Sequence, residues 1–154
     1  YSTSDERKQG LEEAIEGTNI KIVEEQPDEG SREKAQQVME NYLVKYPEGE
    51  ISAVFAQDDN GAIGAYNAVE SAGRVGEFPI YAGATGDYGT ISYIEQGLIA
   101  GTAVQSPVID AQTALTWAVW MALGNELPAF YNYIETPLAT PDNIASLNIA
   151  QWES

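Results

Sequence analysis

Apolar positions along the chain alternate between two spacings, one typical of helices and one typical of buried strands. Between Ser31 and Pro47 they recur every three or four residues, which predicts an amphipathic helix with a solvated opposite face. The stripe consists of Ala35, Val38, Met39, Tyr42, Leu43 and Tyr46. Residues 51–56 (ISAVFA) then form a short continuous apolar run, which is typical of a strand covered on both faces in a parallel sheet.

The same alternation continues over most of the chain. Further helices are predicted over residues 5–16, 60–72, 88–96 and 107–123, and further strands over 19–24, 78–82 and 100–105. A flexible loop is predicted over 83–87, and one or two strands within 133–149, where prolines mark edges or crossings. This order predicts an α/β fold with a Rossmann-like parallel sheet flanked by helices.

The helix predicted over residues 107–123 is unusually apolar. Pro107 suits its first turn, where the missing N–H costs nothing. Its apolar side chains are spread around much of the circumference instead of along one stripe, and such a helix needs packing partners on several sides. The longest apolar run, residues 113–123, is well short of the roughly 20 residues that a membrane span requires.

Length and composition narrow the range of functions. A chain of 154 residues is expected to form one domain. Seven Lys and Arg against 24 Asp and Glu give a formal net charge of −17, which excludes nucleic acid as a partner because phosphate contacts need basic side chains. The absence of Cys and His excludes thiol nucleophiles, Ser-His-Asp triads and nearly all transition-metal sites. We therefore expect no cofactor and no metal.

Polar residues follow three of the predicted strands, at residues 26–30, 57–60 and 85–87, and Gln105 closes a fourth strand. In an open parallel sheet, ligands bind beyond the carboxyl ends of the strands. Carboxylate and amide groups that converge there can each hold two neighbouring sugar hydroxyls, and they could equally hold a cation.

Simpler roles compete with ligand binding at these positions. Asp59 is expected to be a helix N-cap, whereas Asp58 fits a ligand contact and a solvated loop acid equally well. For Gln105, as for Asp58, a ligand contact and a role without a ligand fit the sequence equally well. Gly83 is expected to serve backbone geometry, and residues 58–60 lack the spacing of a calcium-binding loop. A pair of carboxylates acting as acid and base stays open as an enzymatic alternative, although the lack of His and Cys disfavours it.

Five short motifs occur along the chain in an order that points to one protein family. They are residues 6–11 (ERKQGL), 54–69 (VFAQDDNGAIGAYNAV), 83–86 (GATG), 94–107 (IEQGLIAGTAVQSP) and 136–144 (TPLATPDNI). They resemble, in the family's own order, motifs of type I periplasmic sugar-binding proteins of the ribose-binding-like group, which serve ABC importers. The resemblance implies two α/β lobes that are joined by a hinge and close over a monosaccharide, without catalysis.

The resemblance also implies roles for individual residues. Asp58 matches a position that is usually Asn and binds sugar hydroxyls, Gln105 matches a ligand-binding Gln at the hinge, and Thr85 stands where a sugar-binding Asp is usual. Asp5 stands where some relatives have a sugar-binding Arg. Residues expected at helix caps or the hinge are Asp59, Gly83, Ser106 and Pro137.

Residues 1–105 together with about 136–154 are expected to form the second, ligand-binding lobe, with its first strand missing. Segment 106–135 would then pack with an absent N-terminal lobe, or its helix 107–123 could mediate a dimer. The implied partners are a sugar and an ABC permease, and the implied location is extracytoplasmic, either periplasmic or lipid-anchored. The alternative is the effector domain of a LacI-type transcription regulator, which shares the fold.

Overall fold

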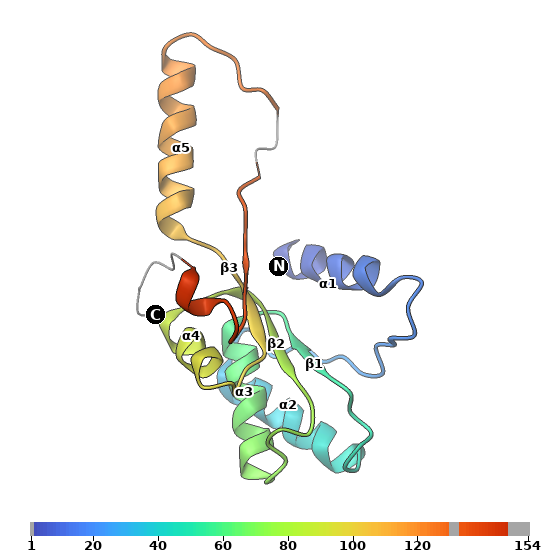
Figure 1. The fold of residues 1–154 in the computed structure, drawn as a ribbon. Helices are drawn as coiled ribbons and strands as arrows, with labels where there is room; N and C mark the ends of the chain where they lie inside the picture. The colour runs from blue at the N-terminus through green and yellow to red at the C-terminus, as the bar shows by residue number, and fades with distance from the viewer. Residues whose placement is uncertain (1, 130–132, 148–154) are drawn as a thin grey trace.

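The structure, a computed structural model, describes residues 2–129 and 133–147 and has α/β architecture. Its sheet has the order β1-β2-β3-β4, in which the first three strands are parallel and β4 is antiparallel to β3 (Figure 1). The strands are β1 (Val54–Ala56), β2 (Ile80–Thr85), β3 (Gly101–Val104) and β4 (Leu138–Ala139). The helices are α1 (Ser2–Ile15), α2 (Arg32–Lys45), α3 (Asp59–Ser71), α4 (Tyr88–Glu95), α5 (Pro107–Ala122) and the short 3-10 helix η1 (Ile144–Ser146).

The core lies between the sheet and the three helices α2, α3 and α4. Alternate strand residues such as Ile80, Ala82 and Val104 point to this face, where they meet side chains that have almost no exposed surface. The largest of the fully buried apolar side chains are Ile63 of α3, Ile94 of α4 and Ile99 of the turn before β3. The apolar stripe of α2 contributes Met39, as predicted, because its helical spacing places it on the side facing α3.

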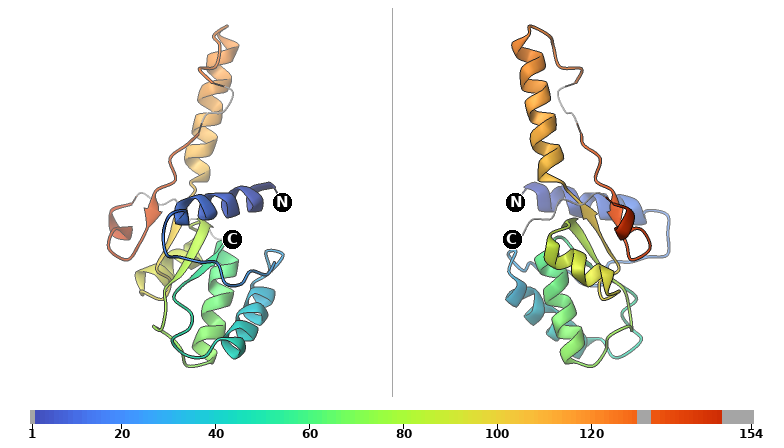
Figure 2. Two further views of the ribbon diagram at one scale, coloured as in Figure 1. Left: turned by 90° about the vertical axis from the view of Figure 1, so that its right-hand side faces the viewer. Right: turned by 60° about the vertical axis from the view of Figure 1, so that its left-hand side comes forward.

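The opposite face of the sheet is only partly covered, which corrects the expectation that residues 51–56 form a strand buried on both faces. Phe55 of β1 and Tyr81 of β2 are both 39% exposed. Within the described residues, α1 is the helix that crosses this face (Figure 2), and a groove of about 420 Å³ remains beneath it. Its lining includes Arg7 and Leu11 of α1 and Leu138 of β4.

The predicted strand over residues 19–24 is not a strand in the structure. The segment has no regular secondary structure and pairs with no strand among the described residues, and Ile20 and Val23 are 64% and 69% exposed. Its β-branched residues satisfy strand propensity, but a strand also requires a partner for its backbone N–H and C=O groups. The sheet ends instead at β1.

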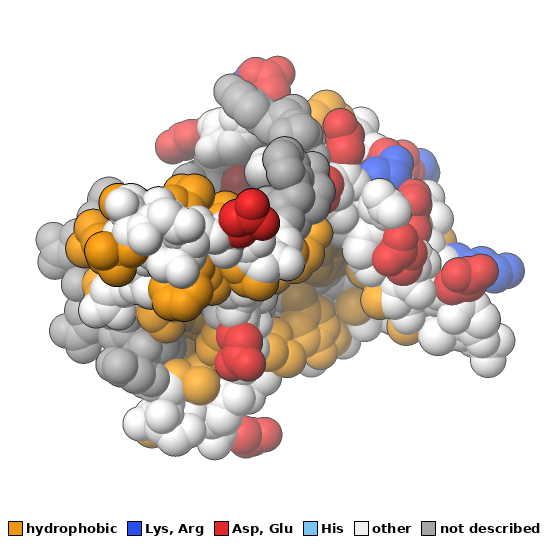
Figure 3. All heavy atoms as spheres, turned by 90° about the horizontal axis from the view of Figure 1, so that it is seen from above, with side chains coloured by type: hydrophobic (Ala, Val, Ile, Leu, Met, Phe, Trp, Pro, Cys, Tyr) orange, Lys and Arg blue, Asp and Glu red, His pale blue; other side chains and the backbone are white. Residues whose placement is uncertain are grey.

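Helix α5 projects from the rest of the molecule, and the chain returns to the sheet at β4 (Figure 1). As predicted, α5 begins after Ser106 with Pro107 in its first turn. None of its residues is buried. Figure 3 looks down on this arm and shows apolar side chains gathered around it. The large exposed ones are Val108, Ile109, Leu115, Val119, Trp120 and Met121.

The predicted strand region 133–149 contains the two-residue β4 and then η1, and residues 148 and 149 lie outside the described residues. No helix in the described part of the chain combines the length and the apolar character needed to cross a membrane.

An ion pair closes the turn between α3 and β2 against the C-terminal end of α2. Arg74 donates to Glu77 through Nε and Nη2, at 2.5 Å and 2.6 Å, and its Nη1 donates to the carbonyl oxygens of Leu43 and Tyr46. The side chains of Arg74 and Glu77 are 13% and 11% exposed. The hydrogen bonds from Arg74 and then from the Gly49 N–H lower the pKa of Glu77 from 4.5 to about 2.

Acid is therefore expected to weaken the fold through Glu77. The pKa of Glu77 is lower in the folded chain than in the unfolded chain. The contribution of Glu77 to the free energy of unfolding is therefore complete above about pH 4.5 and is lost as the pH falls towards 2. Urea unfolding measured across this range should show a flatter pH dependence for Glu77→Gln than for the wild type. Glu95→Gln, on an exposed position of α4, is the matched control for the loss of one acidic charge. An equally large flattening in that control would contradict the assignment.

Candidate functional site

The carboxyl ends of β1, β2 and β3 meet at one edge of the sheet, and three of the four predicted ligand residues lie there. Asp58 follows β1, Thr85 ends β2 and Gln105 follows β3. Thr85 is paired with Val104 in the sheet, and the Gln105 N–H donates to the Thr85 carbonyl at 3.0 Å. The structure thus brings these side chains to a common edge, as parallel strands require, and their role in binding stays a prediction.

The structure assigns the capping role to Asp58, and it gives Asp59 a role that the sequence did not suggest. Helix α3 begins at Asp59, so Asp58 is the N-cap, and its Oδ1 accepts a hydrogen bond from the Gly61 N–H at 2.8 Å. The expectation that Asp59 is the cap is therefore wrong by one residue. Asp58 is half-buried, and capping with Oδ1 leaves Oδ2 for a ligand at the edge of the sheet.

Asp59 is buried, with 3% of its surface exposed, and it connects α3 to the turn after β2 and to β3. Its Oδ2 accepts hydrogen bonds from the Gly86 N–H at 2.7 Å, the Asp87 N–H at 2.8 Å and the Thr85 hydroxyl at 3.2 Å. Its Oδ1 accepts from the Thr102 hydroxyl of β3 at 3.0 Å. One carboxylate therefore holds the start of α3, the turn after β2 and the middle of β3 together.

The predicted loop over residues 83–87 is also corrected, because β2 continues through Thr85. Gly83 is a strand residue and not a helix cap. A β-carbon on Gly83 would lie 2.8 Å from the carbonyl oxygen of Gln57, so glycine permits the close approach of β1 and β2. Two further residues complete this region, in roles that the sequence analysis did not assign. Asp87 caps α4 by accepting from the Thr90 N–H at 2.7 Å, and Thr102 donates to Asp59. The Asp87 cap could have been found, because an acidic residue directly precedes the predicted helix.

The connection to α5 begins at the same edge. Ser106 caps α5, as its place before Pro107 suggested, through a hydrogen bond from the Ile109 N–H at 3.4 Å. The Val104 N–H donates to the Pro137 carbonyl at 2.9 Å, so the chain leaving for α5 and the chain returning from it run side by side. Two adjacent segments of this kind are compatible with the predicted hinge between lobes. The opening and closing movement of that hinge stays a prediction. The Gln105 side chain is exposed and donates from Nε2 to Asp110 Oδ2 at 3.0 Å.

Asp5, the fourth predicted ligand residue, is exposed in the first turn of α1. The described residues form no hydrogen bond that joins it to Asp58, Thr85 or Gln105. Its helix is nevertheless anchored near this edge, because Arg7 Nη1 donates to the Gln57 carbonyl at 3.1 Å. In the part of the chain that the structure describes, there is no group of three or more acidic side chains placed to hold a metal ion.

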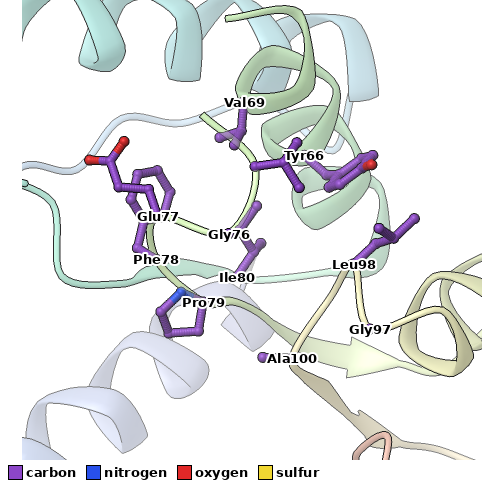
Figure 4. A pocket seen from close by; sticks show the side chains of 11 residues that line it. Tyr66, Val69, Gly76, Glu77, Phe78, Pro79, Ile80, Gly97, Leu98 and Ala100 are labelled. Carbon is purple, nitrogen blue, oxygen red and sulfur yellow. The ribbon is translucent and has the colours of Figure 1, made fainter. Parts of the chain in front are cut away.

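A hollow of about 280 Å³ lies at the other end of the sheet, near the start of β2 and the turn before β3 (Figure 4). Glu77 lines it, but its carboxylate is already bonded to Arg74 and to the Gly49 N–H. The remaining lining is mostly apolar: Tyr66, Val69, Val75, Gly76, Phe78, Pro79, Ile80, Gly97, Leu98 and Ala100. This hollow offers few free polar groups to a hydroxylated ligand, so the carboxyl edge is the stronger candidate.

Comparison with known proteins identifies relatives over most of the chain. Residues 1–126 match the family model described as "Periplasmic binding protein domain". The ribose import binding protein RbsB of Haemophilus influenzae is 28% identical over 128 residues, which are 83% of this chain and 42% of that protein. RbsB of Escherichia coli K12 is 31% identical over 106 residues, or 69% of this chain and 34% of that protein.

Solved structures agree with the sequence comparisons. A periplasmic solute-binding protein of an ABC transporter from Actinobacillus succinogenes, with bound D-allose, superimposes with a TM-score of 0.83 at 30% identity. The match covers 93% of this chain and 50% of that one. The chain thus spans a third to a half of the length of these relatives, and its sheet matches the expected fold of one lobe. This chain belongs to the periplasmic binding protein domain family.

Proposed function

We propose that this chain is the second ligand-binding lobe of an extracytoplasmic solute-binding protein, which recognises a monosaccharide or related polyol for ABC-type import without catalysis. One observation carries the proposal: within a chain of this family, Asp58, Thr85 and Gln105 converge at the carboxyl edge of the sheet. Carboxylate, hydroxyl and amide groups at that edge match the hydroxyl groups of a sugar.

The relatives support a transport role over the regulator alternative. Proteins named for ribose import and for D-allose binding match the chain at 28% to 31% identity, and a solved relative carries bound D-allose. These ligands suggest a compound of the same class for this chain. A location outside the cytoplasmic membrane and an ABC permease as partner follow from the same relationship. The acidic surface is compatible with this location.

The projecting arm supports the proposed division into lobes. In this division, residues 1–105 with about 136–154 form the ligand-binding lobe, and segment 106–135 contacts a second, N-terminal lobe. Residues 1, 130–132 and 148–154 lie outside the described residues. None of the residues of α5 is buried in the described part of the chain. Burying a helix of this kind contributes several kcal/mol at about 25 cal/mol per Å² of apolar area. The side-by-side strands at Val104 and Pro137 would then form part of the hinge between the lobes.

Calorimetric titration of the two-lobed protein tests the function. The panel contains D-ribose, D-allose, L-arabinose, D-galactose, xylitol and myo-inositol, and at least one compound is expected to bind with one molecule per protein. Replacing Gln105 with Ala removes the amide at the edge and should weaken binding by about tenfold, which corresponds to the loss of one or two hydrogen bonds.

Gln96→Ala is the matched control and should leave affinity unchanged, because among the described residues this amide donates to Ser92, at the end of α4. Absence of binding by every compound in the panel would contradict the proposed function. Equal affinity for wild type and Gln105→Ala would remove Gln105 from the site while leaving the function intact.

A further inference from the structure

The groove beneath α1 lies on the face of the sheet that is opposite the core, and it has a volume of about 420 Å³. This volume falls in the usual range of small-ligand sites, about 300–1,000 Å³. Its floor takes residues from all four strands: Phe55, Tyr81, Gly83, Ala103 and Leu138. Because neighbouring strands lie about 4.8 Å apart, this floor extends for about 14 Å across the sheet. The groove is therefore long enough to hold an extended chain.

Space remains in the groove because α1 does not fill it. Gly10 of α1 lines the groove, and a β-carbon on Gly10 would meet no atom within 4 Å. On the side of the sheet, the Phe55 ring lies against Gly83, since a β-carbon on Gly83 would be 3.0 Å from Phe55 Cζ. Phe55 and Tyr81 each keep 39% of their surface exposed. An apolar ligand would remove this surface from water, which favours binding.

Arg7 of α1 adds a positive charge to this apolar lining. Its Nη1 donates to the Gln57 carbonyl at 3.1 Å, and its Nε and Nη2 donate to no other group in the described part of the chain. Lys8, the next residue, is paired with Glu25 at 2.6 Å, whereas Arg7 forms no ion pair among the described residues. The positions three and four residues away on α1 carry no acid either. The guanidinium is thus held in place with N–H groups that match a carboxylate.

The net charge of −17 restricts where an anion can bind this chain. So many acidic groups repel anions over most of the surface, so a carboxylate needs a site where positive charge and apolar contact act together. A neutral apolar ligand would leave Arg7 without an acidic partner. A sugar would place its hydroxyl groups against apolar side chains, where they lose their hydrogen bonds to water. The groove therefore favours an anion with an apolar body.

We propose that this groove is a second ligand site, which takes a medium-chain fatty acid. The carboxylate pairs with Arg7, beside the end of β1, and the alkyl chain extends over the apolar floor towards Leu138 of β4. The site lies on the face of the sheet, and it is separate from Asp58, Thr85 and Gln105 at the carboxyl edge. It does not depend on the proposed recognition of a sugar.

Calorimetric titration of the two-lobed protein with sodium octanoate tests this site. Octanoate is expected to bind with one molecule per protein. Hexanoate should bind more weakly and decanoate more tightly, by about fourfold for each methylene, because each methylene adds apolar contact in the groove. 1-Octanol has the same chain without the charge, so it should bind at least about tenfold more weakly than octanoate. Octylammonium, which carries the opposite charge, should not bind.

Arg7→Met removes the charge and keeps an apolar side chain of similar length. This variant should bind octanoate at least about tenfold more weakly than the wild type and should bind 1-octanol equally well, which shows that the groove itself is retained. Lys8→Met is the matched control, because it removes the same charge from the same helix at a residue that is bonded to Glu25. Its affinity for octanoate should be that of the wild type.

Gly10→Leu places a side chain in the open space and should weaken the binding of octanoate and of 1-octanol together. Gln9→Leu adds a similar side chain at an exposed position of α1 and should leave both affinities unchanged. Thermal melting of each variant confirms that it is folded.

Equal affinities for octanoate and 1-octanol in the wild type, or an unchanged affinity for octanoate in Arg7→Met, would overturn the proposal, because the groove would then not select a carboxylate. Absence of saturable octanoate binding would overturn it as well, and this is the result expected if another part of the longer protein or a second copy fills the groove.

Discussion

Replacing Asp59 with Ala is expected to lower the free energy of unfolding by about 4 kcal/mol, a large part of the total stability of a domain of this size. The substitution removes the acceptor for two backbone N–H groups and two hydroxyls. The N–H groups of Gly86 and Asp87 and the hydroxyl of Thr102 belong to buried residues, so they lose their partner without gaining free access to water. Urea denaturation followed by circular dichroism measures the change.

The neighbouring substitution Asp58→Ala is the matched control for this effect. This substitution removes an N-cap whose residue is half-buried, so it should lower the free energy of unfolding by only about 1 kcal/mol. Asp59→Asn should fall between the two, because an amide oxygen can still accept from Gly86 and Asp87 while its nitrogen donates to Thr102. If Asp59→Ala destabilised the chain no more than Asp58→Ala, the four-bond network would not hold the strand ends together.

Replacing Gly64 with Ala is expected to destabilise the packing of α3 against α2 by about 3 kcal/mol. A β-carbon on Gly64 would lie 2.4 Å from the carbonyl oxygen of Arg32, 2.8 Å from the Ala35 β-carbon and 3.0 Å from the Gln36 nitrogen. Two of these atoms belong to the backbone of α2, so no side-chain rotation relieves the overlap. The helices must separate, which opens the core around Met39.

Gly10→Ala is expected to have the opposite effect on the stability of the same chain. Gly10 lies inside α1, and a β-carbon there would meet no atom within 4 Å. The substitution should stabilise the chain by about 0.5–1 kcal/mol, because alanine loses less conformational freedom than glycine in a helix. Thermal melts of the two variants should therefore shift in opposite directions. A shift in the same direction, or no loss for Gly64→Ala, would contradict the close contact of α2 and α3.

The elements that could be predicted were those whose signal is local. The stripe from Ala35 to Tyr46 predicted α2 because helical spacing places those side chains on one face whatever packs against it. Ser106 and Pro107 likewise mark the start of α5 through backbone chemistry that needs no distant partner. The order of the motifs then indicated the family, which the comparisons confirm.

The predictions that failed depend on what lies next to a segment in space. Residues 19–24 have the composition of a strand, yet the described residues offer their backbone no neighbour. Phe55 lies in an apolar run, yet α1 covers its face only in part. Whether a segment of this kind is paired or covered depends on residues far away in the sequence, so its own composition cannot decide it.

In the candidate site, too, the features with a local sequence signal could be predicted, whereas those that depend on distant residues could not. The polar strand ends placed Asp58, Thr85 and Gln105 at one edge, because parallel strands end together. The N-cap was predicted one residue too late, at Asp59 instead of Asp58, because the position of the helix start decides which of the two carboxylates caps the helix and which is buried. The burial of Asp59 and its bond to Thr102, 43 residues away, are tertiary features that adjacent residues do not reveal.

Hydrogen–deuterium exchange of the two-lobed protein, with and without its sugar, tests the central claim that this lobe binds ligand at the carboxyl edge of its sheet. Binding there should slow exchange in residues 57–61, 85–90 and 104–107, and leave residues 75–79 and 97–100 around the hollow of Figure 4 unchanged. Protection confined to the hollow, with none at the three strand ends, would contradict the account.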